Sequence, residues 1–401
     1  MATGLAIITL LGLLMNTLFV KMRLPGLLGM LILGIAIGPY GFDWIDAGLM
    51  SASADFRKIA LIIILLRAGL GISRESLNKV GYAAIRLSII PGVLEGLAIS
   101  LIAVPLLGFT WIQGGILGFI LAAVSPAVIV PMMIQLSERG VGTDKNIPTL
   151  ILAAASVDDV VAITIFSAFL GLYSGAHVNI GIQLAWIPVS ILLGIGVGIL
   201  SGIVLVKIFE RYHIRDTKKV LVILGIAIML TALETALKNR LEIAALLGVM
   251  TIGFILLEKR PVVAHRLSAK FGKIWVFAEI LLFVLVGAQV DPSVALGAGP
   301  SGLLILAVGL TARSVGVLIS TTSTPLNYKE RLFCVVAYLP KATVQAAIGA
   351  IPLTLGVEGG DVIMAVAVLS ILVTAPLGAL GIRISAPRLL AQSEPPAEGI
   401  V

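Results

Sequence analysis

Two adjacent acidic residues, Asp158 and Asp159, stand in the middle of the long apolar run ILAAASVDDVVAITIF. Neighbouring residues of an α-helix point about 100° apart, so one carboxylate can face a cavity while the other faces a basic partner. A carboxylate is a hard oxygen ligand that suits a small hard cation when carbonyls, hydroxyls or water complete the shell. The same oxygens hold either a proton or a metal ion, so the pair predicts a site where two cations compete. The alternative is a pair kept only for packing against an arginine or a lysine.

Other ionisable residues also lie inside apolar segments, namely Glu95, Glu279, Arg67, Arg86, Arg313 and Lys341. Each such charge costs about 2.5–3.5 kcal/mol at the centre of a membrane helix, so we expect partners or a water-filled cavity. Glu95 can pair with Arg313 or with Lys341. Arg67 and Arg86 stand near helix ends, where a long side chain reaches the membrane interface. Glu279 fits a cavity ligand or a pair partner.

Prolines interrupt two apolar segments in the same way. Pro126 and Pro131 fall within LAAVSPAVIVPMM, and Pro340 falls within AYLPKATVQAAIGAIP, which also contains Pro352. Proline removes a backbone donor and clashes with the carbonyl four residues earlier, so each helix should kink or unwind. Transporters use such breaks to place half-helix ends and freed carbonyls at the middle of the membrane. Prolines are also ordinary in membrane helices, and it is the pairing of the breaks, one of them containing Lys341, that favours a functional pair.

These residues must be positioned by membrane helices, because the composition excludes a soluble fold. Hydrophobic residues make up 59% of the chain and charged residues 12%, whereas soluble domains carry roughly 25% charged residues. The net charge of +7 comes from Lys and Arg in short loops, without interleaved aromatic residues, so it does not indicate nucleic acid. A single cysteine, Cys334, and three histidines exclude a disulfide framework and argue against a zinc site.

The apolar runs predict about thirteen membrane-spanning helices. They cover residues 4–20, 24–40, 57–72, 81–107, 111–136, 147–171, 183–207, 218–237, 241–257, 273–290, 299–321, 330–356 and 362–382. Lys and Arg concentrate in alternate loops, as at Arg139, Lys145 and Lys259, which places those loops and the C-terminus in the cytoplasm and the N-terminus outside. Lys238 and Arg240 are the main exception. The first run lacks a basic leader and a cleavage site, so it is interpreted as a retained helix.

The two proline breaks lie seven spans apart, and an offset of seven reverses the direction of the chain across the membrane. The chain therefore divides into two inverted six-helix repeats, residues 4–171 and 218–382, with a linking helix at 183–207 and a short cytoplasmic tail at 383–401. Glu95 and Arg313 fall at equivalent places in the two repeats. A G-x-x-x-G ladder of Gly194, Gly198 and Gly202 serves close helix packing or dimerisation.

Five segments resemble the monovalent cation/proton antiporter superfamily and, within it, the NHA-type sodium/proton exchangers. They are ILLRAGLGIS (64–73), VSPAVIVP (124–131), SVDDVVAI (156–163), LTARSVGV (310–317) and LPKATVQAAIGA (339–350). The resemblance covers nearly the whole chain in order, and its last two segments are specific. It implies an all-α polytopic membrane protein with the NhaA-like antiporter fold, in which two broken helices cross. It also implies a homodimer, with an ion-transport core drawn from helices within 57–171 and 273–382 and a dimerisation domain from the remaining helices.

The resemblance assigns a role to each residue at the two breaks. Asp159 becomes the ion-binding and proton-carrying carboxylate, Asp158 its partner, and Ser125 a further ligand in the first break. Arg313 takes the place of a lysine that pairs with the first aspartate in bacterial relatives. Lys341 neutralises the negative helix ends at the crossing. Arginine stays charged at any working pH, which favours one proton per ion, but the sequence leaves one and two protons per ion open.

The sequence therefore predicts a secondary antiporter, not an enzyme, that exchanges Na⁺ or Li⁺ for H⁺ by an elevator-like alternating-access motion without a cofactor. A K⁺/H⁺ exchanger or a sodium-coupled symporter of the same architecture is the alternative. An intramembrane aspartyl protease needs two carboxylates that share a proton face to face, which neighbours on one helix cannot do. The expected partners are monovalent cations, protons, membrane lipids and a second copy of the chain, with no nucleic acid. The expected location is a bacterial or archaeal inner membrane.

Overall fold

The computed structural model describes the chain except residues 23, 175–179, 213, 238–242 and 393–401, with no side chain described at 180–185 and 295. Within the described residues the secondary structure is helical, apart from an isolated bridge between Val141 and Gln392. A helix satisfies every backbone polar group inside its own segment, which is what an apolar run in hydrocarbon requires. The expected all-α fold is confirmed. The basic residues Arg23, Lys238 and Arg240 lie outside the described residues.

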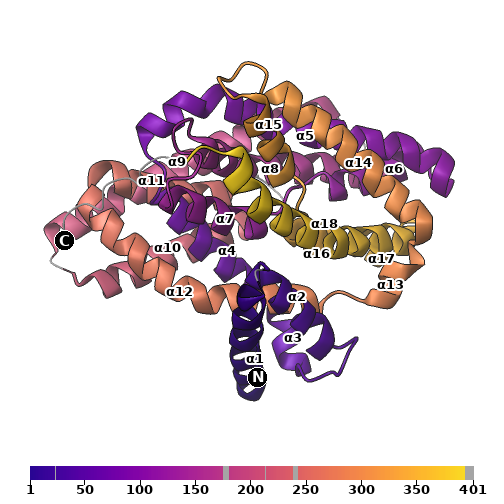
Figure 1. The fold of residues 1–401 in the computed structure, drawn as a ribbon, viewed down its shortest axis with the longest axis horizontal. Helices are drawn as coiled ribbons and strands as arrows, with labels where there is room; N and C mark the ends of the chain where they lie inside the picture. The colour runs from indigo at the N-terminus through magenta and orange to yellow at the C-terminus, as the bar shows by residue number, and fades with distance from the viewer. Residues whose placement is uncertain (23, 175–179, 213, 238–242, 393–401) are drawn as a thin grey trace.

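One group of helices, here called the site bundle, packs around the two proline-broken segments (Figure 1). It consists of α5 (Arg74–Leu107), α6 (Trp111–Leu121), α7 (Pro126–Glu138), α8 (Ile147–Tyr173), α14 (Gly299–Ser320), α15 (Tyr328–Ala337), α16 (Thr343–Ile348), α17 (Ile351–Thr354) and α18 (Gly360–Leu389). Side-chain caps begin several of these helices. Thr110 starts α6 with a capping box, and Ser73 starts α5 by accepting a hydrogen bond from the Ser76 backbone N–H.

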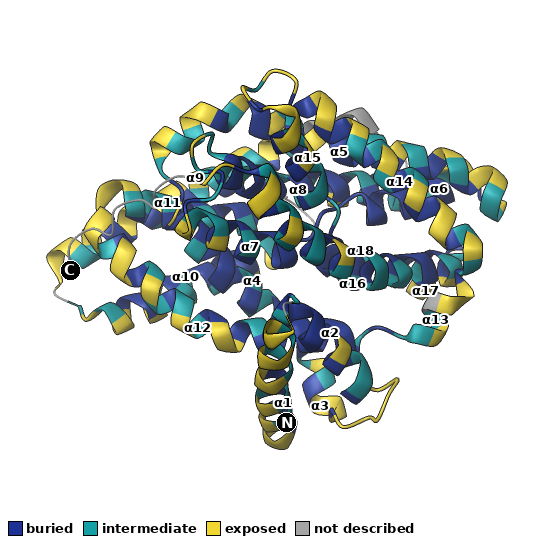
Figure 2. Cartoon of the chain, viewed as in Figure 1, coloured by how far each residue is buried: buried dark blue, intermediate teal, exposed yellow. Residues whose placement is uncertain are grey.

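A second group, here called the flanking bundle, packs beside the first. It consists of α1 (Ala2–Lys21), α2 (Gly26–Ile37), α3 (Ala47–Ser51), α4 (Ser53–Gly69), α9 (Ile180–Arg211), α10 (Asp216–Leu237), α11 (Ala245–Lys259) and α12 (Pro261–Ala288). The short α13 (Pro292–Gly297) connects α12 to α14 and lies against α18. Figure 2 shows α1 largely exposed and α7 largely buried.

The expected core included the spans 57–72 and 273–290, and the helices at these positions pack elsewhere. They correspond to α4 and α12, which pack against each other and against α11 in the flanking bundle. The helices α4 and α12 pack mainly against each other, α2 and α11, whereas α8 and α18 pack directly on the broken helices. The bundle that surrounds the breaks is thus built from the last three spans of each predicted repeat.

Each predicted span contains helix, but helix length supports fewer crossings than predicted. Nine helical segments of the described residues are long and apolar enough to cross a membrane. The helices at 24–40, 57–72 and 241–257 are shorter, with 12, 17 and 15 residues in α2, α4 and α11. The segment at 330–356 is divided into α15, α16 and α17. The finding is an all-helical membrane protein, and the count of thirteen stays a prediction.

Pro131 was expected to break its helix, and this expectation is wrong. The helix α7 continues from Pro126 through Pro131 to Glu138. A proline inside a helix removes one backbone hydrogen bond, and here the buried, apolar surroundings of α7 hold the helix together on both sides of it. The interruption lies before Pro126 instead.

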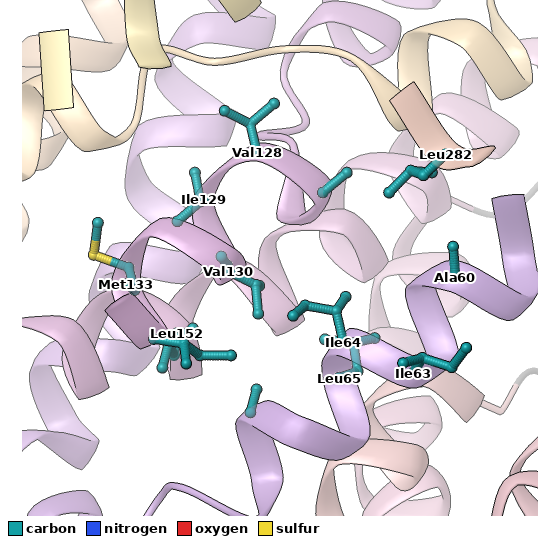
Figure 3. Close-up of a cluster of buried hydrophobic side chains, with 14 of the residues drawn as sticks. Ala60, Ile63, Ile64, Leu65, Val128, Ile129, Val130, Met133, Leu152 and Leu282 are labelled. Atoms are coloured by element: carbon teal, nitrogen blue, oxygen red, sulfur yellow. The ribbon is translucent and has the colours of Figure 1, made fainter. Parts of the chain in front are cut away.

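The two bundles meet across an apolar surface. Figure 3 shows side chains of α7, α4, α8 and α12 that pack together there, among them Val128, Ile129, Val130, Met133, Ala60, Ile63, Ile64, Leu65, Leu152 and Leu282. These side chains are all buried. The contacts among these side chains are nondirectional. A directional contact between α4 and α7, the ion pair of Arg67 with Glu138, lies at the ends of the two helices.

The glycine ladder of α9 packs against α11 in the same chain. A side chain at Gly194 would meet the Ala244 carbonyl, and one at Gly198 would meet the Gly248 carbonyl. Gly202 lies against Ile255. The ladder therefore lets the two helix backbones approach closely, which is the packing role that such motifs have in membranes.

Ion pairs and hydrogen bonds bring the basic loops to one side of the molecule. Lys145 Nζ lies 2.8 Å from Glu330 Oε2, and Arg260 Nε lies 3.2 Å from Glu210 Oε1. Further contacts join the ends of α4, α5, α7 and α11 on that side, namely Arg67 with Glu138 and the Arg74 N–H with Glu258. The basic loops that contain Arg74, Lys145, Arg260 and Glu330 thus lie on one side of the structure.

Candidate functional site

The first broken helix is interrupted between α6 and α7 because three backbone donors are diverted or absent. The Val124 N–H donates to Asp158 Oδ2 at 2.8 Å. The Ser125 N–H donates to the Pro340 carbonyl at 2.9 Å. Pro126 has no N–H and begins α7 at a position where none is needed. The two broken segments therefore meet at Ser125 and Pro340.

Because these backbone donors are diverted or absent, the carbonyls at the end of α6 have no helical partners. Side chains donate hydrogen bonds to these carbonyls instead. Gln345 donates to the carbonyls of residues 120 and 123 at 3.0 and 2.9 Å. Lys341 donates to the carbonyl of residue 121, and Arg313 to that of residue 122 at 2.7 Å. Two of these donors are cations at the negative end of a helix dipole, where positive charge is favoured.

The second broken helix is interrupted at Pro340, between α15 and α16. Ala342 adopts φ −160° and ψ −70°, which is not helical. The Lys341 N–H donates to Thr374 Oγ1 of α18 at 2.9 Å instead of continuing a helix. The break thus turns the Lys341 side chain toward α6, where it caps the first segment.

Four fully buried charges form one network beside the crossing. Arg313 Nη1 lies 2.9 Å from Glu95 Oε2, and Arg313 Nη2 lies 3.1 Å from Asp158 Oδ2. Lys341 Nζ lies 2.8 Å from Glu95 Oε1 and 2.9 Å from Oε2. Glu95 therefore pairs with both cations, and the two alternatives left open by the sequence both occur. The network carries two positive and two negative charges and is balanced.

Asp159 is outside this network. The Asp159 residue as a whole is half-buried. Its Oδ1 atom, however, is inaccessible to solvent and has no hydrogen-bond partner among the described residues. Asp158, one position earlier, is held by the Val124 N–H and by Arg313. The two acids point to different sides of α8, as the helical spacing predicts. A lone carboxylate oxygen in a buried place is free to take a proton or a small cation.

Neutral oxygens lie at the same crossing. Ser125 Oγ and Thr343 Oγ1 are 3.5 Å apart, and both residues are buried. The Tyr338 hydroxyl is buried without a partner among the described residues, and its ring lies 5.5 Å from the Arg313 guanidinium carbon. Sequence reasoning singled out Ser125 but missed Thr343, Tyr338 and Gln345. All three are polar residues within or directly beside the segment LPKATVQAAIGA, which was the available signal.

A cavity of about 1100 Å³ approaches this region between the two bundles. Its lining comes from α4, α7, α8, α11 and α12 and includes Arg67, Glu138 and Leu152. Leu152 lies seven residues before Asp159 on α8, about 10 Å along the helix axis and nearly on the same face. The lining therefore reaches α8 from the side of the basic loops and stops at Leu152, on nearly the same face as Asp159.

The remaining intramembrane charges lie away from the crossing. Arg86 donates to the Ser323 hydroxyl at 2.6 Å and to the Ile319 carbonyl at the end of α14. This agrees with a side chain that reaches the interface. Arg67 pairs with Glu138 at the cavity wall. Glu279 is half-buried on α12, outside the charge network of Arg313.

The broken, crossed helices, the balanced buried charges and the lone carboxylate define a class of protein, the secondary transporters of small ions. Comparison with known proteins specifies the family. The family "Sodium/hydrogen exchanger, transmembrane" matches residues 5–385. This chain belongs to the sodium/hydrogen exchanger family, and it is an integral membrane transporter of that family and not an enzyme. The family exchanges sodium ions and protons and uses no cofactor.

Individual relatives resemble the chain over most of its length. Sodium/hydrogen exchanger 9B2 of Homo sapiens is 34% identical over 390 residues, covering 92% of this chain and 71% of the relative. Sodium/hydrogen exchanger 9B1 of Homo sapiens is 33% identical over 390 residues, covering 94% and 74%. The solved structure of the sodium proton antiporter MjNhaP1 from Methanocaldococcus jannaschii at pH 8 is 20% identical, with a TM-score of 0.76 over 96% of this chain and 97% of that chain. The structural likeness shows the fold.

Proposed function

We propose that the chain exchanges Na⁺ or Li⁺ for H⁺ at the Asp159 carboxylate, with Asp158 as the fixed partner beside it. The observation that carries this proposal is the inaccessible Oδ1 of Asp159, which has no hydrogen-bond partner in the described part of the chain and lies beside the balanced network of Glu95, Asp158, Arg313 and Lys341. Ser125 Oγ supplies a neutral oxygen to the ion shell, and Thr343 lies close enough to Ser125 to do the same. Hard oxygen ligands of this kind suit small alkali cations.

Charge balance supports a stoichiometry of one proton for each ion. Arg313 and Lys341 are matched by Glu95 and Asp158, so only the Asp159 carboxylate needs a monovalent cation to become neutral. A bound proton and a bound Na⁺ give the same net charge. Carrying either one across the membrane therefore moves the same charge, and exchange should not respond to voltage. Arg313 keeps its charge throughout, because a guanidinium does not release its proton in proteins.

An elevator-like motion gives the site alternating access. The apolar surface between α7 and α4 supports this motion, because its contacts are nondirectional. Sliding would have to break the ion pair of Arg67 with Glu138 and the hydrogen bond of the Arg74 N–H to Glu258 at the helix ends. The site bundle would be the ion-transport core, and the flanking bundle would be the dimerisation domain. This division keeps the predicted inverted repeats at 4–171 and 218–382 but assigns α4 and α12 to the dimerisation domain. The cavity beside α8 would be the path from the cytoplasm in the present state.

The membrane arrangement follows from the shared side of the basic loops. With that side in the cytoplasm, thirteen crossings place the N-terminus outside and the tail 383–401 inside. We propose a homodimer in contact with membrane lipids. The host membrane stays a prediction of a bacterial or archaeal inner membrane, whereas the relatives 9B2 and 9B1 named above are human proteins.

The test is dissipation of a pH gradient in proteoliposomes containing the purified chain, with Na⁺, Li⁺ or K⁺ added in turn. Proton flux should follow Na⁺ and Li⁺, and clamping the voltage should leave the rate unchanged. Lower pH should raise the apparent KM for Na⁺, because protons and cations compete for one carboxylate. Asp159→Asn should abolish the flux while the protein still folds.

The matched control is Asp361→Asn, the same change at an exposed residue in the first turn of α18. This variant should transport like the unmodified chain. Exchange at the normal rate in Asp159→Asn would rule out the proposed site. Flux with K⁺ but not Na⁺ would identify the K⁺/H⁺ alternative, and flux that needs an added organic solute would identify a symporter.

A further inference from the structure

Gln345, on α16, joins the two broken helices through its side-chain amide. The residue is 2% exposed. Its Nε2 donates to the Ile120 carbonyl at 3.0 Å and to the Ala123 carbonyl at 2.9 Å. Both amide hydrogens of Gln345 are therefore used on the first broken segment, on either side of the residues capped by Lys341 and Arg313.

The orientation of the Gln345 amide follows from its neighbours. Both nearby groups are carbonyl oxygens, so the nitrogen must face them, and the reverse orientation would place three oxygens together. In this orientation Oε1 is buried without a partner among the described residues. A buried acceptor without a partner is unfavourable, so the two hydrogen bonds that Nε2 donates must outweigh the hydrogen bond that Oε1 does not accept.

The bond to Ala123 also acts on Asp158, through one peptide plane. The Ala123 carbonyl and the Val124 N–H belong to the same trans peptide, so they point in opposite directions. The carbonyl accepts from Gln345 at 2.9 Å, and the N–H donates to Asp158 Oδ2 at 2.8 Å. Gln345 therefore fixes the rotation of the peptide whose other end holds Asp158.

The same link fixes the hydroxyl pair of the site. Ser125 lies two residues after Ala123 on the first broken segment, and Thr343 lies two residues before Gln345 on the second. Their hydroxyl oxygens are 3.5 Å apart. Because Gln345 ties one segment to the other within two residues of each hydroxyl, it restricts how far the two hydroxyls can separate.

We propose that Gln345 is a positioning residue of the cation site, which orients the peptide that holds Asp158 and keeps the hydroxyls of Ser125 and Thr343 together. It does not touch the ion. This inference rests on the proposed exchange at Asp159 and extends it to a residue that acts through the backbone. A site whose ligands are held in place binds its ion more tightly than one whose ligands must first be ordered.

The test compares Gln345→Met with Gln113→Met in proteoliposomes. Methionine has a similar length and fills a buried gap but donates no hydrogen bond. Gln113 is a matched control, because it is also buried on the crossed segments and also donates its Nε2 to a carbonyl, that of Glu358 at 2.7 Å. It stands at the opposite end of α6, about 10 Å along the helix from Ile120.

Gln345→Met should raise the apparent KM for Na⁺ by about tenfold, equivalent to ~1.4 kcal/mol, with a maximal rate within about twofold of the unmodified chain. Gln113→Met should lower thermal stability without changing the KM. Equal KM values in the two variants would overturn the proposal, since Gln345 would then be only structural. If Gln345→Met does not fold, Gln345→Leu provides the same measurement, because leucine also lacks both donors and adds no charge.

A failure of this inference is distinguishable from a failure of the proposed function. Without Na⁺-driven proton flux in the unmodified chain, the exchange proposal itself is lost. With normal flux and an unchanged KM in Gln345→Met and Gln345→Leu, only the positioning role is lost.

Discussion

Replacement of Glu95 by glutamine tests the buried charge network most directly. Glu95 is fully buried and accepts from Arg313 Nη1 at 2.9 Å and from Lys341 Nζ at 2.9 Å. The change keeps the shape of the side chain but leaves two buried cations with one remaining acid, Asp158. The free energy of unfolding should therefore fall.

The size of the loss in unfolding free energy depends on which hydrogen bonds Arg313 and Lys341 retain. Breaking a buried pair by removing one partner costs about 3–5 kcal/mol. Arg313 retains the carbonyls of Ala122 and Tyr338, and Lys341 retains that of Leu121, so we expect the lower end, about 3 kcal/mol. The entropy of unfolding is about 2.1 cal/mol/K per residue, so for 401 residues the melting temperature should fall by roughly 4 °C.

The assay is thermal melting of the detergent-solubilised protein, followed by size-exclusion of the heated samples. Glu75→Gln is the matched control, because it makes the same change on the same helix in an exposed pair with Lys79, where no shift is expected. A second variant, Lys341→Met, should also destabilise. Combined with Glu95→Gln, this change restores the charge balance. The double variant should therefore lose less unfolding free energy than the sum of the losses of the two single variants.

The reasoning would be refuted if Glu95→Gln melted at the temperature of the unmodified chain. It would also be refuted if the effects of Glu95→Gln and Lys341→Met simply added, because groups in direct contact couple by about 0.5–3 kcal/mol. Either outcome would mean that Glu95 does not hold the two cations in the folded protein.

Two other changes test the transport stoichiometry and the helix packing. Arg313→Lys should alter the stoichiometry or the pH dependence of exchange more than the Na⁺ affinity, because a buried lysine can release its proton and arginine cannot. Voltage-clamped proteoliposomes measure both properties. A stoichiometry and a pH dependence equal to those of the unmodified chain would contradict the role of Arg313. Gly198→Leu should lower the melting temperature, because a side chain there meets the Gly248 carbonyl of α11, whereas Gly196→Leu has open space and should be tolerated; equal melting of the two variants would contradict the packing of α9 on α11.

Much of the site could be located from the sequence, because the cost of placing a charge or an unpaired backbone group in a membrane depends on the residue and its own segment. An acid in the middle of an apolar run needs a reason to be there, which singled out Asp158, Asp159 and Glu95. A proline in a buried helix leaves a carbonyl to be satisfied, which indicated the break at Pro340. Pro131 shows the limit of that rule, since one missing hydrogen bond does not break a helix that is packed on both sides.

The solvation of short segments is enough to predict that the chain is helical, that it belongs in a membrane and where its costly charges stand. Which charges meet depends on how distant helices pack. Glu95 and Arg313 are 218 residues apart, and their pairing depends on how α5 and α14 pack. The same packing turns Asp158 toward Arg313 and sets the amide of Gln345 against α6, and it leaves Asp159 Oδ1 without a hydrogen-bond partner among the residues that the structure describes. Such contacts depend on the orientation of whole helices, which local sequence does not specify.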